Sequence, residues 1–325
     1  MSEKNKLGLY GDNLAPMFVI VAASLWAVDG IVLRPVLFNL PVPLVVFIES
    51  LIAAVLITPF MIRKFYSLKE LKTKDWLSFI GVALLGGAIG TMAITRALFY
   101  VNYVNLSIVI LIQKLQPVFA LTLAGLFLNE KLPLKFFTYA VTAIIGAYIM
   151  TFGLSLPSIN ETDKTLLAAA FALLAAFSFG SSTVLSKRAL RNVSFEMGTY
   201  LRFALTTVVM LMISSATQSI SSIADISTKQ LLVFLLIAFT TGGTAIFLYY
   251  YGLKRITASV AAICELAFPL VAVILEYVVH GNILNPVQWV GALILLYSII
   301  KVSGIKPAVK QKILKKEGPD LTSPE

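Results

Sequence analysis

The segment LIQKLQPVFA, residues 111–120, places an amide, a charge and a proline within one of the most apolar parts of the chain. In it, Gln113 stands four residues before Pro117. A second segment, AICELAFPLV, residues 262–271, has a glutamate and a proline at the same spacing. Because proline lacks the N–H that would bond the carbonyl four residues back, each segment predicts a helix interrupted at a polar residue. The recurrence indicates a feature that serves the whole molecule.

The composition predicts an integral membrane protein. Of the 325 residues, 58% are hydrophobic and 13% are charged, whereas soluble domains are about 25% charged. A helix needs about 20 apolar residues to cross a bilayer, and lipid-exposed backbone must satisfy its own hydrogen bonds. We therefore predict an all-α fold with ten transmembrane helices, at residues 15–37, 42–62, 76–99, 105–128, 134–153, 164–185, 196–216, 229–252, 257–280 and 286–304.

The basic residues predict the orientation of these helices. If the N-terminus is cytosolic, most of the 26 Lys and Arg residues fall in cytosolic loops and tails, and Lys164 and Lys229 fall on the opposite side. This distribution follows the positive-inside rule. It accounts for the net charge of +10 without a nucleic-acid partner. We expect an integral protein of the plasma (inner) membrane with both termini cytosolic and a basic tail that contacts membrane lipid.

The chain contains an internal repeat. A shift of 152 residues aligns Gln113 with Glu265 and Pro117 with Pro269. Each half has five predicted spans, and because five is odd the second half must be inverted, an arrangement that places substrate sites near the membrane midplane. The predicted organisation is a cytosolic N-terminus (1–14), a first five-helix repeat (15–153), a linker (154–163), a second five-helix repeat (164–304) and a cytosolic tail (305–325).

The ends of the two repeats resemble a known family. LQPVFALTLAGLFLNEKLPLKFFTYAVTAIIGAYIMTFG, residues 115–153, and FPLVAVILEYVVHGNILNPVQWVGALILLYSIIKVSG, residues 268–304, are similar to the signature of EamA-type transporters in the drug/metabolite transporter superfamily. The resemblance covers about residues 15–304. It implies a carrier of ten helices, arranged as 5+5 inverted repeats around a central cavity. The second half departs from the pattern, because Gly281-Asn282 stands where the first half has Asn129-Glu130.

Ionisable residues within spans are costly and are candidates for function. The candidate substrate-binding residues combine these charges with the proline-linked polar positions: Glu265, Gln113, Lys114, Asp29, Pro117 and Pro269. Glu265 and Asp29 are also candidate proton sites, since carboxyl groups at membrane depth form proton relays. We expect Glu49 to form a structural ion pair with Arg96, Lys114 or Arg202. The alternative for the proline segments is a structural kink packed by neighbouring helices.

These features favour a secondary carrier that moves a small polar metabolite by alternating access. Groups of both signs suit an amino acid or related zwitterion, and this is the predicted substrate. Nucleotide-linked metabolites, quaternary amines or drug-like cations, and lipid-linked sugars remain alternative substrates. The protein could also form a homodimer. An intramembrane enzyme or a channel is disfavoured. With one His and one Cys in the chain, clustered metal ligands are lacking, so we expect no cofactor, no metal and no catalytic site.

The predicted orientation can be tested by thiol labelling. A cysteine at Gly281, in a Cys264→Ser background, should react with an impermeant thiol reagent added to intact cells, because the positive-inside rule puts this loop outside. Labelling that requires permeabilised cells would reverse the orientation.

Overall fold

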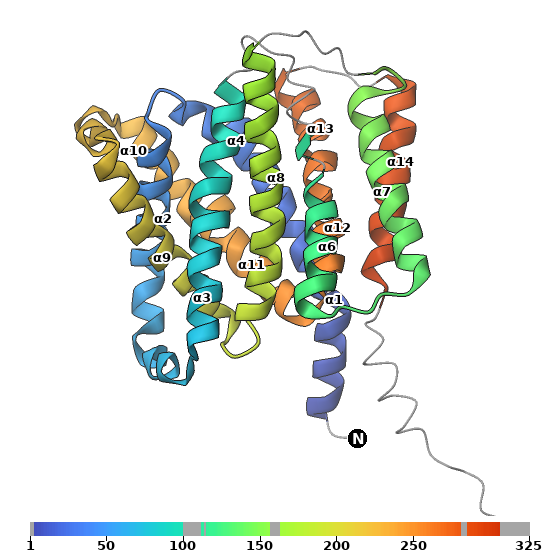
Figure 1. Cartoon of the computed structure of the whole chain (residues 1–325), viewed down its shortest axis with the longest axis horizontal. Helices are drawn as coiled ribbons and strands as arrows, with labels where there is room; N and C mark the ends of the chain where they lie inside the picture. The colour runs from blue at the N-terminus through green and yellow to red at the C-terminus, as the bar shows by residue number, and fades with distance from the viewer. Residues whose placement is uncertain (1–2, 100–111, 114, 157–162, 281–284, 306–325) are drawn as a thin grey trace, which may run out of the picture.

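The computed structural model describes residues 3–99, 112–113, 115–156, 163–280 and 285–305. Its elements are helical throughout these ranges (Figure 1). Regular helices alternate with short π and 3-10 segments, labelled η. In chain order they are α1 (Glu3–Val28), η1 (Asp29–Leu33), η2 (Arg34–Leu37), α2 (Val42–Met61), η3 (Ile62–Glu70), α3 (Thr73–Val82), η4 (Ala83–Ile89), α4 (Gly90–Phe99), α6 (Gln116–Leu128), α7 (Leu134–Phe152), α8 (Asp163–Ala189), α9 (Phe195–Ala216), η5 (Ser219–Asp225), α10 (Thr228–Ile237), η6 (Ala238–Gly242), α11 (Gly243–Arg255), α12 (Ala258–Cys264), α13 (Ala267–His280) and α14 (Pro286–Ser303).

Eight helical stretches among the described residues are long and apolar enough to cross a membrane. Two further apolar helices, Gln116–Leu128 and Leu134–Met150, are shorter. The predicted fourth span, 105–128, lies partly outside the described residues. The predicted first span, 15–37, matches the apolar stretch Leu14–Leu37, although the helix α1 itself already begins at Glu3. The all-helical membrane architecture is thus confirmed, whereas ten spans in two inverted repeats stay a prediction.

Apolar side chains cover the outside of the bundle. On α7, Phe137, Val141 and Ile145 are exposed at intervals of four residues, which places them on one face of the helix. On α14, Leu293, Leu296 and Ile300 are also exposed. Contiguous apolar surface of this kind is unfavourable in water but matches the hydrocarbon core of a bilayer.

The bundle consists of two lateral groups of helices with α8 between them (Figure 1). Figure 1 shows α7 and α14 side by side at one end, α2, α9 and α10 at the other, and α8 between them. The α7–α14 contact is close because two glycines meet there. A Cβ atom at Gly146 would lie 2.7 Å from the backbone nitrogen of Leu295 and 3.0 Å from the carbonyl oxygen of Gly291. Small residues permit this approach between membrane helices.

Two π-helical segments, η4 and η6, occur at similar places in the two halves of the sequence. Just after each segment, a threonine hydroxyl donates to a carbonyl within the segment, five residues back: Thr91 to Gly86 at 3.2 Å and Thr244 to Phe239 at 2.5 Å. Both threonines and both carbonyls are related by a 153-residue shift, one more than the shift that aligns the prolines. Segments of this type often mark functional positions.

The α7–α14 contact generates a stability prediction. Gly146→Ala should destabilise the protein by about 1 to 3 kcal/mol, because the added methyl group overpacks the contact. Gly125→Ala is the matched control, since nothing lies within 4 Å of a Cβ at that position. The melting temperatures of the two purified variants are measured in detergent. Equal melting temperatures would show that the α7–α14 contact accommodates the added methyl group without loss of stability.

Candidate functional site

Glu265 lies in the break between α12 and α13. Its N–H still bonds the carbonyl of Ala261 at 2.9 Å, so it ends the first helix. Pro269 follows in the first turn of α13, where a missing N–H is tolerated. The sequence predicted that Pro269 leaves the Glu265 carbonyl free, and this is wrong. That carbonyl accepts a hydrogen bond of 3.0 Å from the N–H of Phe268.

The Glu265 side chain is held by three donors from three helices. The Tyr249 hydroxyl on α11 donates to Oε1 at 2.7 Å, and the Thr183 hydroxyl on α8 donates to the same oxygen at 3.3 Å. Gln116, the first residue of α6, donates from Nε2 to Oε2 at 2.7 Å. Hydrogen bonds to an ionised group are stronger than neutral ones. We call these four residues the carboxylate cluster.

Aromatic rings and a second hydroxyl network surround the carboxylate cluster. The ring of Trp26, on α1, lies 5.3 Å from that of Tyr249. Beside it, the hydroxyls of Ser186 and Tyr250 are hydrogen bonded at 2.9 Å. The guanidinium of Arg202, on α9, lies over the Tyr250 ring at 5.9 Å and interacts electrostatically with Glu265. Groups from α1, α6, α8, α9 and α11 therefore converge on one carboxylate.

The first proline segment contributes to this site through a different residue from the one predicted. Gln116 contacts Glu265, whereas Gln113 was the residue predicted to bind substrate, and that role stays a prediction. Lys114 lies outside the described residues. Pro117 is buried as the second residue of α6, so it begins a helix, as Pro269 does within the first turn of α13. Each proline thus stands in the first turn of a helix, Pro117 in α6 next to Gln116 and Pro269 in α13 four residues after Glu265.

Glu130 fixes the start of the helix that carries Glu265. Its carboxylate accepts hydrogen bonds from the backbone N–H of Ala258 at 2.7 Å and of Ser259 at 3.1 Å, and from the Ser259 hydroxyl at 2.6 Å. An acidic group at a helix N-terminus satisfies free N–H groups and complements the helix dipole. Sequence reasoning noted Glu130 as part of the family signature but assigned it no role.

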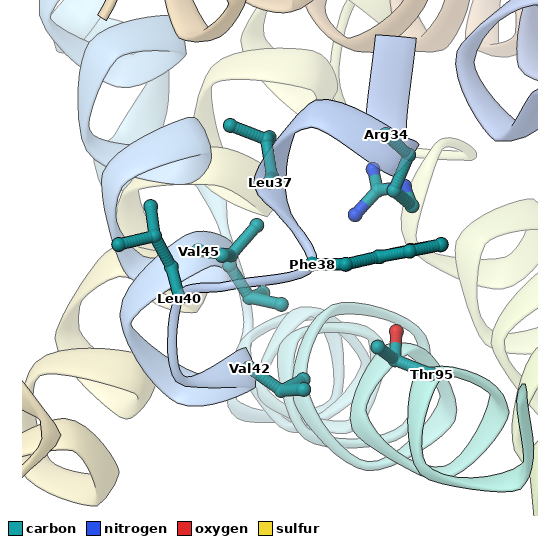
Figure 2. Close-up of a pocket in the computed structure, with 8 residues that line it drawn as sticks. Arg34, Leu37, Phe38, Leu40, Val42, Val45 and Thr95 are labelled. Atoms are coloured by element: carbon teal, nitrogen blue, oxygen red, sulfur yellow. The ribbon is translucent and has the colours of Figure 1, made fainter. Parts of the chain in front are cut away.

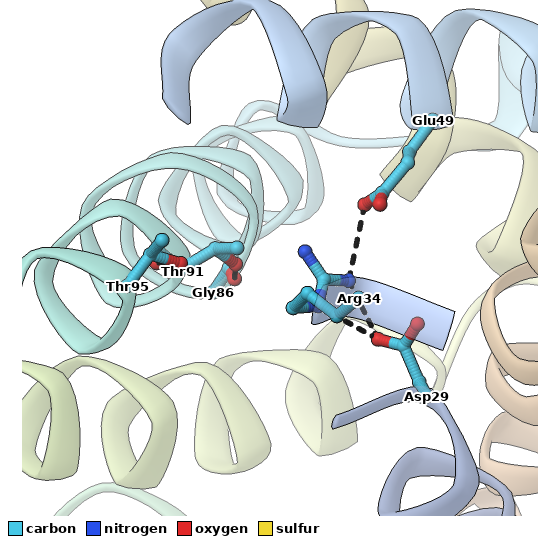
Figure 3. Close-up of polar contacts among 6 residues, drawn as sticks. All are labelled: Asp29, Arg34, Glu49, Gly86, Thr91 and Thr95. Carbon is cyan, nitrogen blue, oxygen red and sulfur yellow. Dashed lines mark hydrogen bonds and ion pairs between the residues drawn. The ribbon is translucent and has the colours of Figure 1, made fainter. Parts of the chain in front are cut away.

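A second charged cluster lies where α1 gives way to η1 and η2. Arg34 donates to Asp29 Oδ2 from Nε at 2.9 Å and from Nη2 at 2.6 Å, and to Glu49 Oε2 from Nη2 at 3.3 Å. Figure 3 shows the guanidinium between the two carboxylates, with Thr91 and Thr95 on the facing helix. We call Asp29, Arg34 and Glu49 the arginine cluster. Asp29, a candidate substrate-binding residue, is thus part of an ion pair between side chains of the first two spans.

The predicted pairing of Glu49 with Arg202 or Arg96 is therefore corrected. Glu49 pairs with Arg34, although α2 and α9 do pack against each other. Positions that match across a repeat are equivalent without necessarily facing one another. Arg202 is directed towards Tyr250 instead, and Arg96 lines a cleft at the end of α4.

Two cavities lie around the start of α2, where Val42 lines both. The smaller, shown in Figure 2, is lined by Arg34, Phe38 and Thr95 with apolar residues of η2 and α2. The larger, of about 530 Å³, is lined by Met92, Arg96, Phe171 and neighbours. Both linings are mainly apolar. The hydrogen-bond donors and acceptors that could select a polar substrate are concentrated instead around Glu265, which lines neither cavity.

A model described as the EamA-like transporter family matches the chain twice, over residues 13–152 and 166–304. The chain belongs to this family. The resemblance inferred from the two signature segments is thereby confirmed. Family membership also makes the protein a transporter of the drug/metabolite transporter superfamily rather than an enzyme, as predicted.

Individual relatives extend the comparison. The chain is 44% identical to the riboflavin transporter ImpX of Fusobacterium nucleatum over 288 residues, which cover 88% of this chain and 96% of that protein. It is 27% identical to an uncharacterised transporter of Synechocystis over 241 residues, 72% of this chain and 67% of that one. A solved crystal structure with 14% identity has a TM-score of 0.68, covering 92% of this chain and 98% of its own, and shows that the fold is shared.

The comparison with the riboflavin transporter overturns the predicted amino-acid substrate. That prediction rested on the presence of both signs of charge within the spans. In the structure three of these charges, Asp29, Arg34 and Glu49, are paired with one another. Charges that pair internally say little about the charge of a substrate.

The carboxylate cluster generates a second stability prediction. Tyr249→Phe should destabilise the protein by about 1 to 3 kcal/mol, because it removes a donor from a buried carboxylate. Tyr277→Phe, at an exposed tyrosine of α13, is the matched control and should melt as the wild type does. If both variants melt alike, the Tyr249 hydroxyl does not support Glu265 in the folded protein.

Proposed function

We propose that this protein is a carrier for riboflavin, or for a closely related flavin, in the plasma membrane. The observation that carries the proposal is the 44% identity to a riboflavin transporter along nearly the full length of that protein. Identity at this level over whole chains usually accompanies a similar binding site. The proposed carrier has ten spans in two inverted five-helix repeats, with both termini cytosolic.

The chemistry around Glu265 suits such a substrate. Riboflavin is neutral and combines a flat, three-ring heteroaromatic system with a chain of hydroxyl groups. Aromatic side chains stack on flat rings, and Trp26 and Tyr249 present such rings beside the cluster. A carboxylate accepts hydrogen bonds, so Glu265 can receive one from a substrate hydroxyl or from the ring imide.

Exchange of hydrogen-bond partners explains how binding can rearrange the helices. Glu265 is satisfied by Gln116, Thr183 and Tyr249 in the structure. A buried acceptor is costly to leave without a donor but tolerates replacement of one donor by another. A substrate hydroxyl that replaces Tyr249 or Gln116 would release α11 or α6 from the carboxylate. The carboxylate oxygens of Glu265 would then both bind the substrate and control the movement of the helices.

The irregular helices support alternating access. The interruptions before Pro117 and Pro269 and the π segments η4 and η6 recur in the two halves. Irregular backbone provides hinge points within otherwise regular helices. The remaining predicted residues take secondary places: Gln113 and Lys114 lie beside Gln116 along the chain, and Asp29 belongs to the arginine cluster.

The function is tested with purified protein in liposomes loaded with unlabelled riboflavin. The wild type should take up labelled riboflavin by counter-flow, whereas Glu265→Gln should lose at least about tenfold in rate, since charge-assisted hydrogen bonds contribute about 1.5 to 3 kcal/mol each. Glu70→Gln, at an exposed glutamate of η3, is the matched control and should retain counter-flow.

Internal leucine serves as the control for substrate class. It should not stimulate riboflavin uptake. Stimulation by leucine but not by riboflavin, or the absence of riboflavin counter-flow in folded wild-type protein, would refute the proposal.

A further inference from the structure

The arginine cluster carries an uncompensated charge. Asp29 and Glu49 can each bear a negative charge, and Arg34 supplies one positive charge. Most of the cluster is shielded from solvent: Asp29 is 8% exposed, the Glu49 side chain is 13% exposed and that of Arg34 is 19% exposed. Glu49 stands about 10 Å into α2 at 1.5 Å per residue. An unpaired charge at such a place costs several kcal/mol. With both carboxyl groups ionised, the cluster has one negative charge too many for its surroundings.

Two oxygens of the cluster identify where the missing positive charge can sit. Asp29 Oδ1 and Glu49 Oε1 are buried and have no hydrogen-bond partner among the described residues. Buried polar atoms are nearly always satisfied, so unpartnered oxygens on neighbouring carboxyl groups indicate a ligand. A proton on one of these two oxygens would be such a ligand, because it neutralises one carboxyl group and removes the excess negative charge of the cluster.

The distances distinguish the two carboxyl groups. Asp29 accepts two hydrogen bonds from Arg34, at 2.6 and 2.9 Å, through one oxygen. Glu49 accepts one, at 3.3 Å. Short, paired contacts are typical of an ionised partner of arginine. Asp29 is therefore the counter-ion of Arg34, and Glu49 is the group that can gain or lose a proton at the smaller cost.

Other charged groups lie on the elements packed against this cluster. The elements that contact α2 carry Arg96 on α4, Arg202 on α9, Lys229 on α10 and Asp225 on η5. At the opposite end of α2, Glu196 of α9 is paired with Lys64 of η3. Glu276 lies on α13, which packs against η1, and its side chain is outside the described part. The electrostatic partners of Glu49 itself are Arg34 and Asp29.

We propose that Glu49 is the binding site for one exchangeable proton that couples the carrier to a proton gradient. Loss of the proton gives Glu49 a negative charge and strengthens its bond to Arg34, which joins η2 to α2. Gain of the proton weakens that bond and leaves Arg34, whose side chain also lines the small cavity in Figure 2, held by Asp29 alone. The proton passes between Glu49 and water, with no other bond made or broken. The coupling half of this inference rests on the proposed carrier function.

Proton binding can be measured without any substrate. Infrared spectra of the purified protein, recorded across a pH titration, should contain a protonated carboxyl band that shifts when glutamate, but not aspartate, carries a ¹³C carboxyl label. Glu49→Gln should abolish this band. Asp29→Asn should also abolish it, because Arg34 and an ionised Glu49 then balance each other. Glu70→Gln should retain it. Identical titrations in wild type and folded Glu49→Gln would overturn the proton site, as would a band that shifts with aspartate label.

Coupling is measured in proteoliposomes with an imposed pH gradient. Wild type should accumulate riboflavin, and a protonophore should abolish the accumulation. Glu49→Gln should allow equilibration only, and Glu49→Asp, which keeps a protonatable group, should restore part of the accumulation if Glu49→Gln folds poorly. Riboflavin counter-flow in wild type that ignores the gradient overturns the coupling and leaves the proposed function intact. If wild type moves no riboflavin, the proposed function fails, and the infrared titration alone decides the proton site.

Discussion

A buried carboxylate within a membrane bundle must be surrounded by donors or counter-charges, and this requirement organises the centre of the protein. Glu265 receives hydrogen bonds from Gln116, Thr183 and Tyr249, which stand on three different helices. The prolines serve the same requirement indirectly, because each begins a helix at the depth where a polar side chain is needed. A single carboxylate thus joins residues of α6, α8 and α11.

The two halves meet at this centre without being identical. Glu130, at the end of α6, caps the first turn of α12 and so links the first half to the helix that precedes Glu265. The second half has Gly281-Asn282 at the corresponding place in the sequence and lacks this carboxylate. Such asymmetry fits a carrier in which one half bears the binding carboxylate and the other contributes Gln116. The arginine cluster, confined to the first two spans, adds a second distinction between the halves.

The helical membrane architecture and the family could be predicted from the sequence, because apolar stretches of sufficient length and the signature segments are local patterns. Glu265 could be proposed for the same reason, as a charge beside a proline in an apolar helix. The partners of each charge could not be predicted. Gln116 bonds Glu265 and Arg34 pairs with Glu49, and neither contact follows from the sequence, because side-chain direction depends on how the helices turn after each interruption. The amino-acid substrate was predicted wrongly because internal ion pairs and substrate-binding charges look alike in a sequence.

The most direct test of the central claim, that Glu265 organises the flavin-binding site, is an experimental structure of the protein with riboflavin bound. The flavin ring should lie beside Trp26 and Tyr249, and a hydroxyl or the imide of the flavin should lie within hydrogen-bond distance of the Glu265 carboxylate. At least one of Gln116, Thr183 and Tyr249 should have given up its bond to Glu265. A flavin bound in the cleft beside Arg96, with all three bonds to Glu265 intact, would contradict this account.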